Sequence, residues 1–469
     1  MELWTTWFDL VSQLSKACTR KRTFFWLVII LIGFTIKTDY FGVTSLARGA
    51  GLLPNYYTCM LNFFSSTGIS LDKLLALWVD LVFNKFHGAV NINGRYLIVA
   101  DGIKVGKEGK KMPGVKWLHQ ESESNAKAEY IMGHSLQVIA LLVQGVKGYF
   151  AVPLTARIHE GIRYNCNDKR SLLDKLFETL IEINLPGSYY LVADKYYCSG
   201  RLMKQLVSKG IHIITMMKKN AVAYYLPEEK SSARGRPKKY GEKVKLFDLF
   251  SSGIKFKSAP LPNNPKICIE YCVINLLWKP LGSLAMFVLV KHPVRGNGIV
   301  MSTDLTISPL ELILGYMLRF KIEVLFKQAV HQLGTFMYRF WLKTMMPKSR
   351  GKSSKESLLH FAPKDFKEKV KKKVNAYHLF IQLGLISQGL LQYLSVYHYK
   401  VVWKTLGSWL RTVRDDTLPS EKVVAMAMAR TYHLFIKGGQ YVCIFRKFLI
   451  DRSYFNINYD KYDEHIKAA

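Results

Sequence analysis

The sequence predicts an α/β protein: a core of strands and helices, interrupted by a β-rich insertion, with helical N- and C-terminal regions. Short apolar runs separated by turns fill residues from about 91 to 220. Apolar residues at helical spacing dominate the chain before and after that part. A second group of alternating strands, from about 221 to 305, precedes the return of a helical pattern.

Residues 1 to 90 form the predicted helical N-terminal region. Basic residues in it, Arg20 to Arg22 and Arg48, suit DNA binding, although a plain helical scaffold explains the pattern equally well. The uncharged run Phe24 to Ile36 is shorter than the roughly 18 residues of a membrane span. Lys37 and Asp39 follow it in place of a small-residue cleavage site. We therefore expect a buried core helix here and no stable membrane association.

Residues 91 to 220 form the first part of the predicted core. Two apolar strands in it end in the same dipeptide, Ala-Asp, at Asp101 and at Asp194. The predicted order is three strands (96–101, 135–143, 148–154), a helix (169–183), a strand (189–194), a helix (199–208) and a strand (211–216). This is the ribonuclease H-like order, in which the first and fourth strands are adjacent and parallel. Asp101 and Asp194 are then expected at the C-terminal ends of their strands, at one edge of the sheet.

The rest of the chain divides by composition and pattern. Residues 221 to 305 are the β-rich insertion, and residues 306 to 343 carry the final catalytic helix of the core. A Lys-rich stretch, 344 to 374, is interpreted as a basic linker. Residues 375 to 469 form a helical C-terminal region.

The charge balance indicates a polyanionic partner. Lys and Arg total 67 against 34 Asp and Glu, a formal net charge of +33. Nucleic acid is the first candidate and an anionic membrane surface the second. The seven cysteines are scattered and odd in number, which favours a reducing compartment. Cys268 and Cys272 share one face of a predicted strand and lack partners at zinc-site spacing, so we interpret them as structural.

The helix predicted from Ser308 onward is the most informative element. Ser308 and Glu311 have capping-box spacing, which gives Glu311 a structural role. Further along, polar residues form a single stripe on a helix that is otherwise apolar, and so is expected to be buried; they are Tyr316, Arg319, Glu323 and Lys327. A run of ordinary helix salt bridges is the alternative interpretation of this stripe.

Two carboxylates at the ends of neighbouring strands and a third on a buried helix suit phosphodiester cleavage with two divalent cations. Mg²⁺ prefers oxygen ligands and retains several waters, so a few carboxylates suffice. Asp101 would bridge both ions, with Asp194 and Glu323 each holding one. Asp304, just before the helix, is a competing candidate for the third ligand. His134, after Gly133 at the start of a strand, is interpreted as a buried, hydrogen-bonded histidine.

The chain resembles insertion-sequence transposases of the DDE superfamily that carry a Tyr-x2-Arg-x3-Glu signature. Tyr316, Arg319 and Glu323 match this signature, whereas the Lys that usually follows seven residues later is replaced by Val330. Further matching stretches are 42–48, 107–114, 119–122, 133–134, 234–237, 409–412 and 419–421.

This resemblance implies a transposase that cleaves transposon ends and transfers the 3′-OH strand into target DNA. It also implies two Mg²⁺ ions, with Mn²⁺ as a substitute, and a homodimer on double-stranded terminal repeats and target DNA. The expected location is the bacterial cytoplasm, at the nucleoid. An inactive or domesticated relative that only binds DNA is the alternative, and a peripheral membrane protein is a second one.

The predicted DNA contacts lie in two places. Tyr316, Arg319 and Lys327 would hold DNA phosphates beside the metal ions. Arg234 and Arg236, in an extended Arg-Gly-Arg-Pro stretch, suit a narrow A·T minor groove. A flexible basic loop is an equally good explanation of that stretch.

Overall fold

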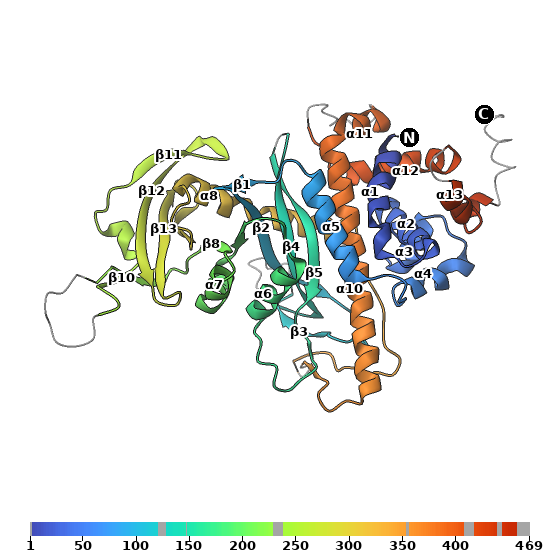
Figure 1. Ribbon diagram of the computed structural model, residues 1–469, viewed down its shortest axis with the longest axis horizontal. Helices are drawn as coiled ribbons and strands as arrows, with labels where there is room; N and C mark the ends of the chain where they lie inside the picture. The colour runs from blue at the N-terminus through green and yellow to red at the C-terminus, as the bar shows by residue number, and fades with distance from the viewer. Residues whose placement is uncertain are drawn as a thin grey trace.

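The computed structural model describes residues 2–120, 128–146, 148–227, 238–352, 356–407, 417–438 and 443–456 (Figure 1). Arg234 and Arg236 lie outside these residues, as do the matching stretch 409–412 and the end of 119–122. The DNA contact predicted for the two arginines therefore stays a prediction.

A mixed sheet of 13 strands crosses the described part of the chain (Figure 1). Its order is β10-β9-β12-β13-β14-β8-β7-β2-β4-β3, with β1 beside β2, β5 beside β4 and β11 beside β12; β6 and β15 form a separate parallel pair. The strands are β1 Asn91–Ile92, β2 Arg95–Gly106, β3 Lys116–His119, β4 Tyr130–Gly145, β5 Gly148–Ile158, β6 Ile162–Arg163, β7 Tyr189–Ala193, β8 His212–Met216, β9 Val222–Tyr224, β10 Lys243–Lys245, β11 Lys257–Leu261, β12 Asn264–Trp278, β13 Ser283–His292, β14 Gly296–Ser302 and β15 Ser357–Leu358.

Strands β2 and β7 form the centre of the sheet and run parallel, as predicted for the two strands that lead to the carboxylates. Their register extends from Tyr96 opposite Tyr189 to Val99 opposite Val192. β8 continues the parallel set beside β7, while β4 pairs antiparallel with β2 and β5 antiparallel with β4. The side chains along β7 are all buried, which explains its continuous apolar sequence.

The strands expected between residues 221 and 305 form, and they extend the same sheet. β14 pairs antiparallel with β8, with Val300 opposite Met216 and Ser302 opposite Ile214. β13 and β12 follow as antiparallel neighbours. This part of the chain is therefore joined to the core by backbone hydrogen bonds as well as by its connecting segments.

Some helices lie beside the sheet, and the others gather at the end of the molecule opposite β12 (Figure 1). Their bounds are α1 Glu2–Ser12, α2 Lys21–Ile36, α3 Val43–Gly49, α4 Tyr57–Phe63, α5 Leu71–Lys85, α6 Leu172–Ile183, α7 Gly200–Val207, α8 Pro309–Leu318, α9 Lys321–His331, α10 Lys364–Tyr397, α11 Tyr399–Leu406, α12 Glu421–Lys437 and α13 Cys443–Ile450. α5, α9 and α10 pack against β5. The indole N–H of Trp78 in α5 donates to the carbonyl of Pro153 in β5 at 2.9 Å, which fixes this packing.

The two ends of the chain pack on one another. The indole N–H of Trp4 in α1 donates to the carbonyl of Met428 in α12 at 3.0 Å, and its ring stacks on Phe435 at 4.9 Å. α2 contacts both α10 and α12. The N- and C-terminal helical regions thus share one apolar core.

Two apolar helices, α2 and α10, bear on the expectation that the Phe24 to Ile36 run forms a buried core helix. In α2, all residues from Trp26 to Ile36 are buried, which confirms the predicted core helix. α10 is long and apolar enough to cross a membrane by length and composition, but 94% of its most apolar window is buried inside the protein. Such burial is what a core helix requires.

The predicted basic linker ends earlier than expected. α10 begins at Lys364, so the Lys371 to Lys373 run is helical. The reason is a set of apolar residues at helical spacing: Phe366, Val370 and Val374 pack with Leu342, Met345 and Leu359 in a small separate cluster. The lysines occupy the remaining positions of that first part of α10.

Candidate active site

Asp101 lies inside β2, and this corrects the prediction that it ends the strand. β2 continues to Gly106 because β4 pairs with it over this whole length, with Asp101 opposite Val138. The pairing of β2 with β7, however, stops at Val99, so Asp101 is no longer paired with β7. One carboxylate oxygen of Asp101 accepts the backbone N–H of Gly102 at 2.8 Å.

Asp194 directly follows the last residue of β7, as predicted. It precedes the short 3-10 helix Lys195–Tyr197, and its carbonyl accepts the hydroxyl of Thr215 in β8 at 3.0 Å. This bond holds the turn after β7 against the neighbouring strand. Because β2 and β7 are parallel, Asp101 and Asp194 lie toward the same edge of the core.

The helix that carries Glu323 is interrupted, which the sequence pattern did not predict. α8 ends at Leu318 and α9 begins at Lys321, so Arg319 and Phe320 form a turn between them. Phe320 is 56% exposed. Glu323 therefore lies in the first turn of α9 and is itself exposed, where the continuous pattern suggested a buried carboxylate four turns into one helix.

Arg319 and Tyr316 connect the three carboxylates. One guanidinium nitrogen of Arg319, Nη1, donates to Oδ2 of Asp101 at 3.0 Å. The other, Nη2, donates to Oε1 of Glu323 at 2.9 Å. The hydroxyl of Tyr316 lies 3.5 Å from Oδ1 of Asp194, as a long hydrogen-bond donor. The structure thus brings all three predicted carboxylates and two predicted DNA-contacting residues into one cluster.

The close approach of the acidic groups and Arg319 shifts the pKa values of Asp101 and Arg319. Burial raises the pKa of Asp101 to about 6, although the Gly102 N–H and Arg319 lower it, and Asp194 and Glu323 raise it further. Burial lowers the pKa of Arg319, but the surrounding acidic groups, Asp101 first, more than reverse this effect. Arg319 therefore forms ion pairs with two of the three acidic groups, and further positive charge would be stabilised there.

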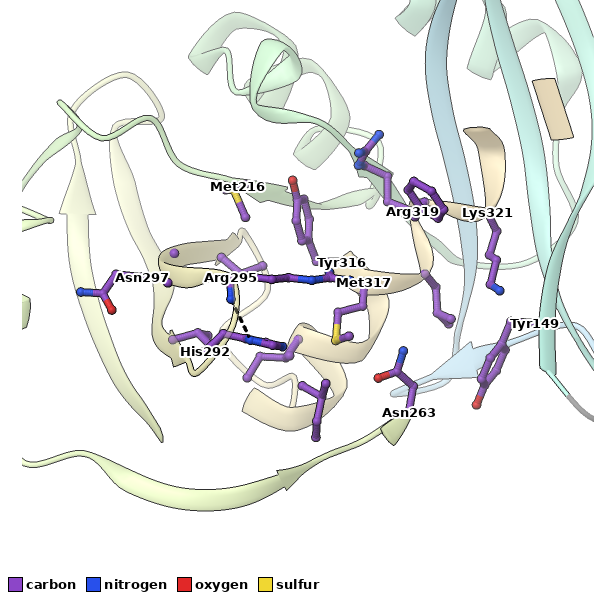
Figure 2. A pocket seen from close by; sticks show the side chains of 18 of the residues that line it. Tyr149, Met216, Asn263, His292, Arg295, Asn297, Tyr316, Met317, Arg319 and Lys321 are labelled. Carbon is purple, nitrogen blue, oxygen red and sulfur yellow. Dashed lines mark hydrogen bonds between the residues drawn. The ribbon is translucent and has the colours of Figure 1, made fainter. Parts of the chain in front are cut away.

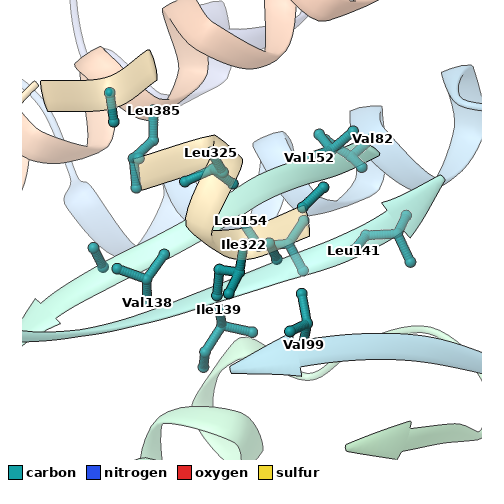
Figure 3. Packing of buried hydrophobic residues seen from close by; sticks show 14 of the residues in the cluster. Val82, Val99, Val138, Ile139, Leu141, Val152, Leu154, Ile322, Leu325 and Leu385 are labelled. Atoms are coloured by element: carbon teal, nitrogen blue, oxygen red, sulfur yellow. The ribbon is translucent and has the colours of Figure 1, made fainter. Parts of the chain in front are cut away.

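The apolar side of α9 anchors the cluster to the core. Figure 3 shows Ile322 and Leu325 of α9 among Val138, Leu154 and Leu385, which come from β4, β5 and α10. Ile322 is fully buried and Leu325 nearly so. Because Glu323 follows Ile322 directly, this packing turns it toward the opposite, accessible side of the helix.

A cavity of about 940 Å³ opens beside the cluster, between the β13–β14 hairpin and the junction of α8 and α9 (Figure 2). Tyr316 and Arg319, which hydrogen-bond to the three carboxylates, belong to its lining. Polar and basic side chains from both sides surround it, namely Tyr149, Asn263, His292, Arg295, Asn297 and Lys321. A cavity with cations on its rim suits a phosphodiester backbone. No sequence pattern singled out Arg295 or Lys321.

The competing acidic residues have other environments. Asp304 is buried and accepts the hydroxyl of Tyr190 at 2.6 Å and the backbone N–H and hydroxyl of Thr306 at 2.8 and 2.7 Å. Tyr190 lies near the start of β7, at the opposite end from Asp194. The capping box predicted for Ser308 and Glu311 does not form, because the side chain of Ser308 makes no capping hydrogen bond.

Two other residues singled out in the sequence, Lys327 and His134, lie on the surface and in the core, respectively. Lys327 is exposed on α9. His134 is fully buried, with its ring nitrogens 2.6 Å from the Tyr338 hydroxyl and 2.9 Å from the Pro113 carbonyl, as expected of a hydrogen-bonded core histidine. The described residues contain no group of three His, Cys, Asp or Glu already arranged to hold a metal ion. Arg319 joins Asp101 to Glu323, and Tyr316 contacts Asp194.

Comparison with known proteins adds an independent observation. The sequence profile of a family described as "DDE superfamily endonuclease" matches residues 10–251, slightly more than half of the chain, and thus includes Asp101 and Asp194. A solved structure of piggyBac transposase in a synaptic complex with hairpin DNA is similar at 11% identity and a TM-score of 0.39, over 94% of this chain and 81% of that one. No curated protein matches this chain.

Proposed function

The chain belongs to the DDE superfamily of endonucleases, and on that premise we propose that it is a transposase. In this proposal it cleaves DNA at transposon ends and transfers the resulting 3′-OH strand into target DNA. Asp101, Asp194 and Glu323 are its catalytic carboxylates. The observation that carries the assignment is the cluster in which Arg319 contacts Asp101 and Glu323 while Tyr316 contacts Asp194.

The donor set fits divalent metal ions. All three acidic side chains offer oxygen ligands, which Mg²⁺ prefers, and the pKa of Asp101 is raised by its burial first and also by the nearby Asp194 and Glu323. We propose that Asp101, Asp194 and Glu323 together hold two Mg²⁺ ions, with Mn²⁺ as a substitute. Two such ions would activate the attacking oxygen and stabilise the leaving one.

The protein groups around the carboxylates would position the DNA. The two terminal nitrogens of Arg319 donate to two different carboxylates, and guanidinium N–H groups bind phosphate as readily as carboxylate. Arg295 and Lys321 lie on two sides of the adjoining cavity and would hold the backbone in it. Lys327 and Tyr316 would contact neighbouring phosphates. These contacts orient the scissile bond toward the carboxylates and are independent of base sequence.

The topology supports a ribonuclease H-like core. The order β5-β4-β2-β7-β8, with β2, β7 and β8 parallel, is the order expected for that fold. Residues 221–305 would then be the β-rich insertion, here attached through β14. Residues 1–90 would supply further DNA contacts, and we propose that a homodimer binds the two DNA ends in the bacterial cytoplasm, at the nucleoid.

A cleavage assay tests this function against that of a DNA-binding relative without activity. The substrate is double-stranded DNA that carries the sequences flanking the gene, incubated with Mg²⁺ or Mn²⁺. We expect cleavage by the wild-type protein, loss of cleavage in Asp101→Ala, Asp194→Ala and Glu323→Ala, and nearly unchanged DNA binding in all three. Binding without cleavage by the wild-type protein would instead support the inactive relative.

A further inference from the structure

A second cavity, of about 720 Å³, lies near the end of β2, beyond Asp101. It is bordered by β2, β3, β4 and the extended segment that follows α9. Its lining combines large aromatic rings with cations: Trp117, Tyr130, Trp341, Lys107, Arg339 and Arg350. None of these residues takes part in the carboxylate cluster.

Two aromatic rings of this lining surface are parallel, and one of them has a donor without a partner among the described residues. Trp117 of β3 and Tyr130 of β4 stack with ring centroids 5.5 Å apart and planes inclined by 5°. The indole N–H of Trp117 is buried and has no hydrogen-bond partner among the described residues. A buried donor without a partner is costly, so this N–H is suited to an acceptor supplied by a ligand. Trp341, which also lines the cavity, is 60% exposed.

The cations are fixed around this surface. The ammonium group of Lys107 donates to the carbonyl groups of Phe336 and Tyr338 and lies 3.6 Å from the centre of the Tyr338 ring. It thereby holds the segment that presents Arg339, which is exposed. Arg350 is held by a hydrogen bond to the carbonyl of Glu108.

The surface continues beyond the cavity. The guanidinium of Arg339 lies 5.9 Å from the centre of the Phe41 ring, and that of Arg48 lies 5.9 Å from the same ring. Phe41 is 58% exposed. Alternating arginines and exposed rings of this kind are typical of surfaces that bind unpaired nucleic acid.

We infer that this cavity binds an unstacked nucleotide of the DNA strand, an inference that rests on the proposed function. The base would stack on Trp341 or on the Trp117–Tyr130 pair and accept the Trp117 N–H. The adjacent phosphates would contact Arg339 and Arg350. Two exposed arginines of the lining, Arg339 and Arg350, outnumber its single carboxylate, that of Glu108, so the charge favours an anionic ligand.

The position along β2 links this site to the carboxylates. Asp101 and Gly106 lie on the same strand, and at about 3.3 Å per residue the five steps between them span roughly 17 Å. A DNA strand cut at Asp101 could therefore reach the cavity within a few nucleotides. Unpaired bases near the cleavage position would be its ligand.

The inference can be tested by comparing single-stranded and duplex DNA in the presence of EDTA, so that cleavage does not interfere. Fluorescence anisotropy would measure binding of a labelled oligothymidylate and of a blunt duplex. Trp341→Ala should weaken oligothymidylate binding roughly tenfold, as expected for one lost stacking contact, and leave duplex binding little changed. Trp117→Phe, which keeps a ring and removes the N–H, should produce a smaller loss on the same substrate.

The matched control is Phe361→Ala, which removes an 85% exposed ring outside the cavity. It should bind both substrates as the wild type does. Equal losses on both substrates in Trp341→Ala, or no loss, would overturn the inference while leaving the proposed function intact. Failure of the wild-type protein to bind any DNA would instead reject the proposed function.

Discussion

Arg319 and Asp101 are 218 residues apart in the sequence, yet the guanidinium of the first lies 3.0 Å from the carboxylate of the second. The same guanidinium also binds Glu323. Asp101 and Arg319 are both largely buried, with side chains 23% and 16% exposed. Arg319 is therefore a positive charge shared by two acidic groups, one from β2 and one from α9.

Removal of Arg319 should lower the free energy of unfolding and make it sensitive to divalent cations. In Arg319→Ala the acidic groups lose their shared partner, and we expect a loss of about 2 kcal/mol in the free energy of unfolding, as for a buried charge-assisted hydrogen bond. Mg²⁺ should recover part of this loss. Thermal melting with and without Mg²⁺ measures both effects.

Lys327→Ala is the control for that experiment, since Lys327 is exposed on the same helix. It should leave melting unchanged under both conditions. An Arg319→Ala protein as stable as the wild type in EDTA would show that the ion pair does not support the cluster.

Glu323→Gln should abolish cleavage with little effect on stability. Glu323 is 44% exposed and keeps an oxygen that can accept from Arg319 after the substitution, so the folded state loses little. Glu311→Gln is the matched control, because Glu311 lies on the preceding helix and its predicted capping box is absent. Cleavage and melting would be measured for both proteins. Comparable cleavage by the two variants would remove Glu323 from the catalytic set.

Several elements were predictable because local sequence specified them. The strands before Asp101 and Asp194 are continuous apolar runs, and their parallel pairing follows from the alternation of strands and helices between them. The helix at 24–36 was predictable from its length and its flanking charges. Tyr316, Arg319 and Glu323 were found from their spacing, and the structure places them together.

Other features depend on contacts that sequence pattern does not express. β2 runs past Asp101 because β4 pairs with it there, and the partner is distant in sequence. The break at Arg319 and Phe320 occurs within an apolar pattern that continues through it, so periodicity indicated one helix. Ser308 is the N-cap residue of α8, as predicted, but its capping box does not form, because spacing shows which residues could hydrogen-bond and cannot show which side chains turn toward the backbone.

Asp304→Asn should destabilise the fold and spare the chemistry. Burial raises the pKa of Asp304, but hydrogen bonds from Tyr190 and Thr306 lower it more, so the net shift is downward. A lowered pKa means that the ionised form stabilises the fold above the ordinary value of about 3.9, and that this stability is lost as the pH falls. We expect a loss of about 1–3 kcal/mol at neutral pH. The variant should also lack this part of the acid dependence.

Denaturant unfolding at several pH values measures the effect of Asp304→Asn. Cleavage per folded molecule should stay near the wild-type level, because Asp304 lies at the other end of β7 from Asp194. A stable variant that has lost cleavage would instead make Asp304 the third catalytic carboxylate.

The cavity beside the carboxylates should contribute to DNA affinity in a manner that depends on salt. Each neutralised phosphate adds about −0.9 to the slope of log K against log[salt]. Arg295→Ala and Lys321→Ala each remove one cation from the cavity lining, so each should weaken duplex binding and flatten the slope by about one such step. Lys400→Ala, an exposed lysine on α11, is the control and should leave both quantities unchanged. Slopes that are equal in all four proteins would mean that DNA does not occupy this cavity.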